Sequence, residues 1–136
     1  MAIVYVNIGS NLGHRESLIS QAIDLISDNF GFYCVSRIVE SEPWGFDSTN
    51  IFMNIGVAFK SELHPEIILD KLQSIEKKIS SVSHRDNQGN YKDREIDIDI
   101  MEIEGVNYQS ERLCVPHPHL HERDFFQIPL RDLKPI

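Results

Sequence analysis

The chain has few cysteines, few basic residues and no long apolar run. Its 136 residues include two cysteines, Cys34 and Cys114, which lie far apart without a CxxC or zinc-like spacing. We expect both thiols to be reduced and buried in strands, with a disulfide as the minor alternative. The opening stretch MAIVYVNIGSN has no basic segment and is too short to cross a bilayer. These absences predict a cytoplasmic protein with no membrane partner.

Acidic residues outnumber basic ones by 21 to 13, and the formal net charge is −8. Proteins that bind duplex nucleic acid need a basic surface to displace the counterions of the phosphates, so this balance argues against a nucleic-acid partner. The length suits one domain, and a hydrophobic fraction of 41% is enough for one core. We therefore expect a single domain over residues 1–136, and a monomer.

Hydrophobic periodicity predicts the elements in the first half of the chain. The β-branched residues 2–8 predict a buried strand, after which Ser10 or Asn11 can cap a helix. Residues 31–41 and 51–60 predict two further strands. The apolar stripe of the first helix consists of Leu18, Ile19, Ala22, Ile23, Leu25 and Ile26.

Alternation within the strand at residues 51–60 separates its two faces. Phe52 and Asn54 share one face, which places an aromatic ring beside an amide that can both donate and accept hydrogen bonds. The opposite face carries the apolar residues Met53, Ile55, Val57 and Phe59.

The second helix is expected to begin at Pro65, because proline suits the first helical turn. Gln73 and Glu76 lie three residues apart and share one face of this helix. Its buried stripe consists of Ile68, Leu72, Ile75 and Ile79. Residues 80–93 show no periodicity, and loops of this length often cover a site.

The second half of the chain contains one more long strand, predicted at residues 94–103. The segment EGVNY after it predicts a hairpin onto a short edge strand, and the proline-rich tail from Cys114 onward is expected to be irregular. The resulting order, β-α-β-β-α-β, is that of the α+β ferredoxin-like sandwich, in which helices pack on one face of an antiparallel sheet.

Two carboxylates share one side of this last long strand. Asp97 and Asp99 are roughly 7 Å apart at a rise of about 3.3 Å per residue. Such a pair repels unless a cation lies nearby, and Mg²⁺ suits it because this ion takes a few carboxylates together with water and phosphate oxygens. A solvent-facing polar stripe is the alternative, and DxD alone favours that alternative. The other side of the strand carries Ile96, Ile98 and Ile100.

Two further motifs allow more than one interpretation. His117, His119 and His121 alternate as zinc ligands can, but Pro118 interrupts a regular strand there, so zinc is the minor interpretation. The segment GSNLG follows a strand as a phosphate-binding loop would. It lacks the GxGxxG and Walker patterns, however, and favours a tight turn between strand and helix.

Several motifs together resemble those of a known family. In chain order they are YVNIGSNLG, EPWGF, the tripeptide at residues 52–54, QSIE, DREIDIDIM and ERLCVPHPHLHERDFF. They resemble the 6-hydroxymethyl-7,8-dihydropterin pyrophosphokinases of folate biosynthesis, and they span nearly the whole chain. The resemblance implies a ferredoxin-like fold and the transfer of pyrophosphate from ATP to the hydroxymethyl group of the pterin. It also implies two Mg²⁺ ions, with AMP as the other product.

The resemblance implies roles for individual residues. Asp97 and Asp99 look like the magnesium ligands that bridge the ATP phosphates, with Arg94 as a third catalytic residue. The residues that resemble the family's ATP contacts are Gln73, Glu76, Arg94, Ile100, Arg112, His117 and Arg123. The residues that resemble its pterin site are Phe52 and Phe125, the two stacking rings, Asn54, which recognises the polar edge, and Ser41 and Trp44, which bind mainly through the backbone.

The chain departs from the family pattern after the second helix. Ser80 and Ser81 stand where the family has a glycine and a phosphate-contacting arginine, and we expect Arg85 or Lys92 to supply the missing charge. A pterin- or nucleotide-binding homologue that has lost turnover is an alternative of another class. A third is a small ferredoxin-like regulatory or assembly module, which would bind no nucleotide.

Overall fold

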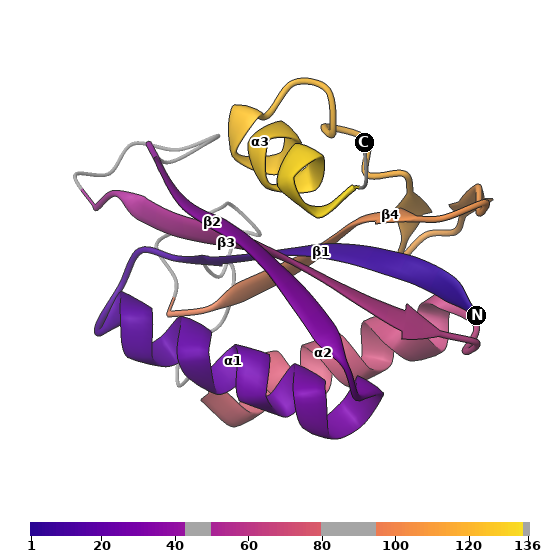
Figure 1. Ribbon diagram of the computed structural model, residues 1–136, viewed down its shortest axis with the longest axis horizontal. Helices are drawn as coiled ribbons and strands as arrows, with labels where there is room; N and C mark the ends of the chain where they lie inside the picture. The colour runs from indigo at the N-terminus through magenta and orange to yellow at the C-terminus, as the bar shows by residue number, and fades with distance from the viewer. Residues whose placement is uncertain (43–49, 80–94, 135–136) are drawn as a thin grey trace.

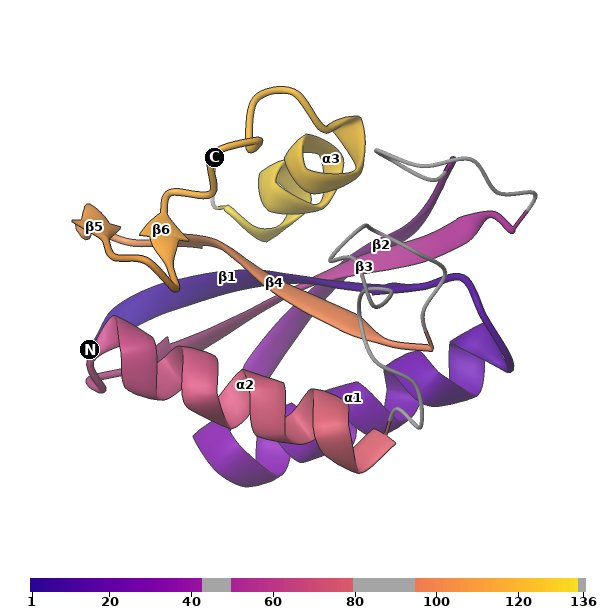
Figure 2. The same cartoon turned by 180° about the vertical axis from the view of Figure 1, so that it is seen from behind.

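The computed structural model describes residues 1–42, 50–79 and 95–134. In these ranges the chain forms a four-stranded antiparallel sheet with helices on both faces (Figure 1). A separate pair of short strands, β5 and β6, lies near one end of β4 (Figure 2). The elements are β1 (Ala2–Ser10), α1 (Arg15–Phe30), β2 (Tyr33–Ser41), β3 (Phe52–Ser61), α2 (Pro65–Ile79), β4 (Asp97–Ile103), β5 (Tyr108–Gln109), β6 (Cys114–Val115) and α3 (Asp124–Leu133).

The strand order β2-β3-β1-β4, with every neighbouring pair antiparallel, confirms the predicted ferredoxin-like arrangement. β1 is an inner strand, so each of its residues can face partners on both β3 and β4. Gly9 pairs with Asn54 on one side and with Asp97 on the other. Asn7 likewise lies between Gly56 and Asp99. The topology thus brings the amide of β3 and the carboxylates of β4 to either side of one strand.

The main core lies between the sheet and the helices α1 and α2 (Figure 2). β1 contributes Val4, Val6 and Ile8, which are fully buried because alternate residues of a strand face the same side. The helices contribute residues of the predicted apolar stripes, of which the buried members are Ile19, Ala22, Ile26, Ile68, Leu72 and Ile75.

The opposite face of the sheet is covered by α3 (Figure 1). The prediction of an irregular tail is therefore wrong in its last part, and helices cover both faces of the sheet rather than one. Phe126 and Leu130, one helical turn apart, are buried in a second cluster together with Tyr5 of β1. The helix also passes close to Gly56, where a Cβ would lie 2.7 Å from that of Pro129. Packing on the sheet thus outweighs the cost of a proline within a helix.

An ion pair fastens the end of α3 to β2. Arg37 donates from its Nε and NH2 to the two carboxylate oxygens of Asp132, each at 2.8 Å. The backbone N–H of Arg37 donates to the same carboxylate at 3.0 Å. These hydrogen bonds lower the pKa of Asp132. Arg37 lies where the register between β2 and β3 shifts, so this irregularity presents both backbone and side-chain donors to α3.

Several local predictions are wrong. β1 continues through Ser10 and α1 begins only at Arg15, so neither Ser10 nor Asn11 caps the helix. β5 pairs with β6 and not with an edge of the main sheet. Both cysteines are free, as predicted, but Cys34 is exposed on the edge strand β2 and Cys114 is partly exposed. Among the described residues, none of the helices has the length and apolar character that a membrane span requires.

Candidate active site

Polar side chains gather on the α3 side of the sheet, where β3, β1 and β4 are neighbours. The apolar residues of β1 that alternate with them face the main core, so Asn7 and Gly9 face α3. The same alternation turns Asn54 of β3 to this side. Asp97 and Asp99 of β4 follow, because the isoleucines between and beside them enter the main core. The prediction that these two carboxylates share one face is therefore confirmed.

A cavity of about 440 Å³ opens beside β4. Asp97 and Asp99 both line it, and both are partly buried. The other predicted nucleotide residues that line the same cavity are Gln73, Glu76, Ile100, Arg112, His117 and Arg123. Only Arg94 of that predicted set is not among them, and it lies outside the described residues. The structure thus brings together residues from α2, β4, the β5–β6 segment and the start of α3.

Glu76 binds the backbone of β4 at Ile98, the residue between the two aspartates. Its side chain is 4% exposed, and its Oε2 accepts the backbone N–H of Ile98 at 2.7 Å. β4 is an edge strand of the described sheet, so the carboxylate supplies an acceptor on the side away from β1. The carboxylate therefore fixes the segment from which Asp97 and Asp99 project.

A bulge in β4 positions His117. The register with β1 skips Met101, whose carbonyl accepts the backbone N–H of His117 at 2.9 Å. His117 Nδ1 accepts the backbone N–H of His119 at 3.0 Å, so the proton of the neutral ring resides on Nε2. Burial, followed by the charges of Arg123 and His119, lowers the pKa of His117 from 6.5 to about 4. His117 therefore brings an uncharged N–H donor to the cavity at neutral pH.

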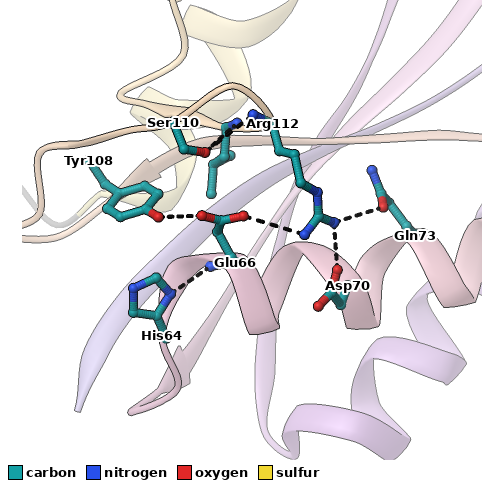
Figure 3. A network of polar contacts seen from close by, with 8 residues as sticks. His64, Glu66, Asp70, Gln73, Tyr108, Ser110 and Arg112 are labelled. Carbon is teal, nitrogen blue, oxygen red and sulfur yellow. Dashed lines mark hydrogen bonds and ion pairs between the residues drawn. The ribbon is translucent and has the colours of Figure 1, made fainter.

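Arg112 is held against α2 by acidic side chains (Figure 3). Its NH2 lies 2.5 Å from Asp70 Oδ1, and its NH1 lies 3.4 Å from Glu66 Oε1. The same NH2 donates to Gln73 Oε1 at 3.3 Å, and the Tyr108 hydroxyl donates to Glu66. The hydrogen bond to Asp70 is the main reason that the pKa of Arg112 is raised. This acidic brace keeps the guanidinium at the rim of the cavity.

The start of α3 carries a cation and an aromatic ring side by side. Arg123 is 7% exposed, and its guanidinium carbon lies 4.9 Å from the ring centroid of Phe126 and 5.5 Å from that of Phe125. Phe125 is partly buried, and its centroid lies 5.0 Å from that of Phe126. The same turn of helix thus contributes Arg123 to the cavity and holds the ring predicted for the pterin.

Asn54 lies in a row of hydrogen bonds that crosses three strands. Its side chain is 1% exposed, and its Nδ2 donates to the Val39 carbonyl at 3.1 Å and to Ser41 Oγ at 2.8 Å. Its Oδ1 accepts from Asn7 Nδ2 at 3.2 Å. The Ser41 side chain is thus engaged with Asn54, and Asn54 links Asn7 to the backbone of β2.

Gly9 lies on β1 between the amide of β3 and the carboxylates of β4. A Cβ at this position would lie 3.2 Å from Asn54 Oδ1 and 3.5 Å from Phe52 Cδ1. Since Gly9 also pairs with Asp97, it is the strand neighbour of both groups of predicted residues. Phe52 and Asn54 share the face predicted for them.

Comparison with known proteins identifies the family. The model of the family described as 7,8-dihydro-6-hydroxymethylpterin-pyrophosphokinase (HPPK) matches residues 5–135. The chain belongs to the HPPK family. Relatives named 2-amino-4-hydroxy-6-hydroxymethyldihydropteridine pyrophosphokinase include that of Porphyromonas gingivalis, with 45% identity over 99% of this chain and 92% of the relative. Those of Aquifex aeolicus and Bacillus subtilis are 36% and 33% identical, over 99% and 96% of this chain and 82% and 77% of their own lengths.

A solved structure shares the HPPK fold. It is described as HPPK-DHPS in complex with substrates, and it matches with a TM-score of 0.73 at 12% identity. The match covers 98% of this chain and 42% of the other, and at this identity it concerns the fold alone. Family membership assigns to this chain the transfer of pyrophosphate from ATP to hydroxymethyldihydropterin in folate biosynthesis, as the sequence motifs predict.

Some side chains around this site of the HPPK chain were not predicted from its sequence. Glu66 and Asp70 recur at helical spacing on α2 together with the predicted Gln73, and this pattern could have indicated a partner for Arg112. Asn7 is the one amide within an otherwise apolar strand stretch, and this contrast was also a usable signal. The predicted or discussed residues that lie outside the described ranges are Trp44, Ser80, Ser81, Arg85, Lys92 and Arg94.

Proposed function

We propose that this HPPK chain binds Mg²⁺ and ATP in the cavity beside β4, and that the pterin binds at Phe52, Asn54 and Phe125. The observation that carries the proposal is the convergence of Asp97 and Asp99 on the cavity that the predicted nucleotide residues line. Gly9 pairs with Asp97 on one side and with Asn54 on the other, so the two proposed sites are neighbours, which suits a reaction that joins a phosphate chain to a pterin.

The donor set fits Mg²⁺. Among the residues that the structure describes, no group of three or more His, Cys, Asp or Glu side chains is arranged to hold a metal ion. A cation at Asp97 and Asp99 would therefore complete its coordination with water and substrate oxygens, as Mg²⁺ prefers and structural zinc does not. When bound, Mg²⁺ supplies positive charge that neutralises the phosphate chain. Two such ions are predicted, as the family resemblance implies.

The chain's own residues bind and orient the phosphates. Arg112 at the rim and Arg123 near His117 supply guanidinium groups, each of which can grip two oxygens at once. The Nε2–H of His117 donates to a phosphate oxygen without taking up a proton at neutral pH. The pterin hydroxyl is the nucleophile, and the protein contributes position and charge.

Hydrogen bonding contributes more than stacking to recognition of the pterin. Stacking against Phe52 and Phe125 contributes about 0.5–1.5 kcal/mol beyond the burial of the rings. A buried amide edge left without its partner costs about 1–3 kcal/mol. Asn54 is therefore the main determinant of selectivity, because its amide is nearly inaccessible to water and held in one orientation.

Release of AMP tests this proposal. The protein with ATP, Mg²⁺ and hydroxymethyldihydropterin should release AMP, and Asp97→Asn should abolish the release while pterin binding persists. Calorimetry with Mg²⁺ and ATP gives a readout that does not depend on turnover, and Asp97→Asn should remove most of the binding heat. Glu104→Gln is the matched control, because it removes the same charge from an exposed turn after β4. Unchanged heat and AMP release in Asp97→Asn would refute the assignment.

A homologue that binds substrates without turnover is the second candidate. Ser80 and Ser81 at the positions of the family's glycine and arginine favour it. It predicts binding heat without AMP release. Compensation by Arg85 or Lys92, the monomeric state and the cytoplasmic location stay predictions.

A further inference from the structure

We propose that Asn7 is a positioning residue for the pterin, because its Nδ2–H holds the Oδ1 of Asn54 in place. The inference rests on the proposed role of Asn54. Asn7 is 3% exposed and faces α3 from an inner strand. It pairs with Gly56 on β3 and with Asp99 on β4, so it lies between the amide side and the carboxylate side of the site.

The hydrogen bonds between the strands have a fixed direction. The Val39 carbonyl can only accept, so Asn54 must turn its Nδ2 toward β2. The second hydrogen of Nδ2 is given to Ser41 Oγ, and Asn54 Oδ1 therefore points toward β1. There it accepts the Nδ2–H of Asn7. A flipped Asn54 would set acceptor against acceptor at the Val39 carbonyl.

This direction determines what Asn54 offers to the substrate. Both of its N–H groups are engaged, whereas Oδ1 has a second lone pair beyond the one that faces Asn7. Oδ1 lies 3.2 Å from the place where a Cβ on Gly9 would stand, so the glycine leaves the approach to this oxygen free of a side chain. Asn54 thus presents an acceptor, and the complementary substrate group is an N–H donor on the pterin edge.

Asn7 is retained at a cost to the fold. Its Oδ1 is buried and has no hydrogen-bond partner among the described residues. A buried carbonyl without a partner destabilises the folded chain, so the amide is not explained by its own packing. Its one hydrogen bond is the donor that it provides to Asn54. A local cost of this kind is typical of positions kept for function.

A double-mutant cycle tests the inference. Dissociation constants for hydroxymethyldihydropterin and for Mg²⁺ with ATP are measured by calorimetry on the full chain, on Asn7→Leu, on Asn54→Ala and on the double variant. Asn7→Leu should weaken pterin binding about tenfold and leave nucleotide binding unchanged, since only the donor to Asn54 is lost. In the Asn54→Ala background, Asn7→Leu should have no further effect, because Asn7 acts through Asn54.

Ser61→Ala is the matched control. Ser61 is a buried polar residue at the other end of β3 from Asn54, and its Oγ accepts the backbone N–H of Leu63 at 3.1 Å, so its replacement should shift the melting temperature without weakening pterin binding. If Asn54→Ala leaves pterin binding unchanged, the proposed role of Asn54 fails and the inference fails with it. If Asn54→Ala weakens binding but Asn7→Leu does not, or if both effects multiply in the double variant, only the inference is overturned. Asn7→Ala repeats the comparison should Asn7→Leu not fold.

Discussion

Glu76 braces the backbone of Ile98, whose N–H it accepts at 2.7 Å from the side of β4 that faces away from β1. Ile98 is the residue between Asp97 and Asp99, so one buried carboxylate fixes the segment that carries the other two. The family resemblance implies that Glu76 contacts ATP. The structure gives it a further role, as the support on which the geometry of the two aspartates depends.

Removing this support should affect both stability and nucleotide binding. Glu76→Leu leaves the Ile98 N–H buried without its acceptor, and we expect a loss of about 1–3 kcal/mol in the free energy of unfolding. Urea titrations measure this loss, and calorimetry should show weaker binding of Mg²⁺ with ATP. Glu76→Gln keeps an acceptor oxygen. It should therefore lose less unfolding free energy and less affinity for Mg²⁺ with ATP than Glu76→Leu. Equal behaviour of Glu76→Leu and the unmodified chain would contradict the supporting role.

The acidic brace on Arg112 should act on substrate affinity and not on turnover. Asp70→Asn removes the charge from the 2.5 Å ion pair and loosens the guanidinium, and we expect the KM for ATP to rise about two- to fivefold with kcat unchanged. The difference should shrink at high salt, because exposed charges are screened. Asp24→Asn on the exposed face of α1 makes the same charge change and should leave the KM for ATP as it was. A fall in kcat with an unchanged KM would contradict the role of these acidic contacts in ATP affinity.

The pKa of His117 predicts a pH dependence of stability. This pKa is about 4 in the folded chain, against 6.5 for an unperturbed histidine. Between these values the unfolded chain binds more protons, so the contribution of His117 to the free energy of unfolding rises from pH 4 to 6.5 and is constant above. His117→Asn cannot titrate there, so its stability curve should be flatter across that range. Urea unfolding at several pH values measures both curves, and parallel curves would exclude this cause.

The close approach of α3 to Gly56 predicts that the position of this helix affects the binding of both substrates. In Gly56→Ala the new Cβ would lie 2.7 Å from Pro129 Cβ and 2.9 Å from Leu133 Cδ1, so the helix must shift. We expect a loss of about 1–3 kcal/mol in the free energy of unfolding. Binding of pterin and of ATP should weaken together, because Phe125 and Arg123 move with the helix.

Gly105→Ala provides the control for this experiment. Gly105 has a φ of 73°, which strains any other residue, but no atom lies within 4 Å of its Cβ position. It should lose stability and keep both affinities. Weakened substrate binding in Gly105→Ala, or undisturbed binding in Gly56→Ala, would show that the position of α3 is not the cause.

The sequence predicts those features that depend on neighbours along the chain. Period two places Asp97 beside Asp99 and Phe52 beside Asn54, and helical spacing predicts α1 and α2. It does not predict α3, because Pro129 argues against a helix whose stability comes from burying Phe126 and Leu130 on the sheet. Partners distant in the chain are also missed.

Two examples show why the sequence does not predict contacts between residues that are distant in the chain. The Asn7–Asn54 hydrogen bond joins residues 47 apart and exists only in one strand register. The brace on Arg112 depends on where the β5–β6 segment lies against α2, and no local pattern specifies that placement. Both relationships follow from the tertiary structure alone.

Arg123 caps the start of α3 and Phe125 lies in its first turn, so one helix joins a residue of the predicted ATP site to a residue of the predicted pterin site. We therefore expect the two substrates to bind with positive cooperativity, and linkage requires each to change the affinity of the other by the same factor. Loosening the Arg37–Asp132 ion pair at the far end of the helix should weaken this cooperativity even where neither affinity alone is altered.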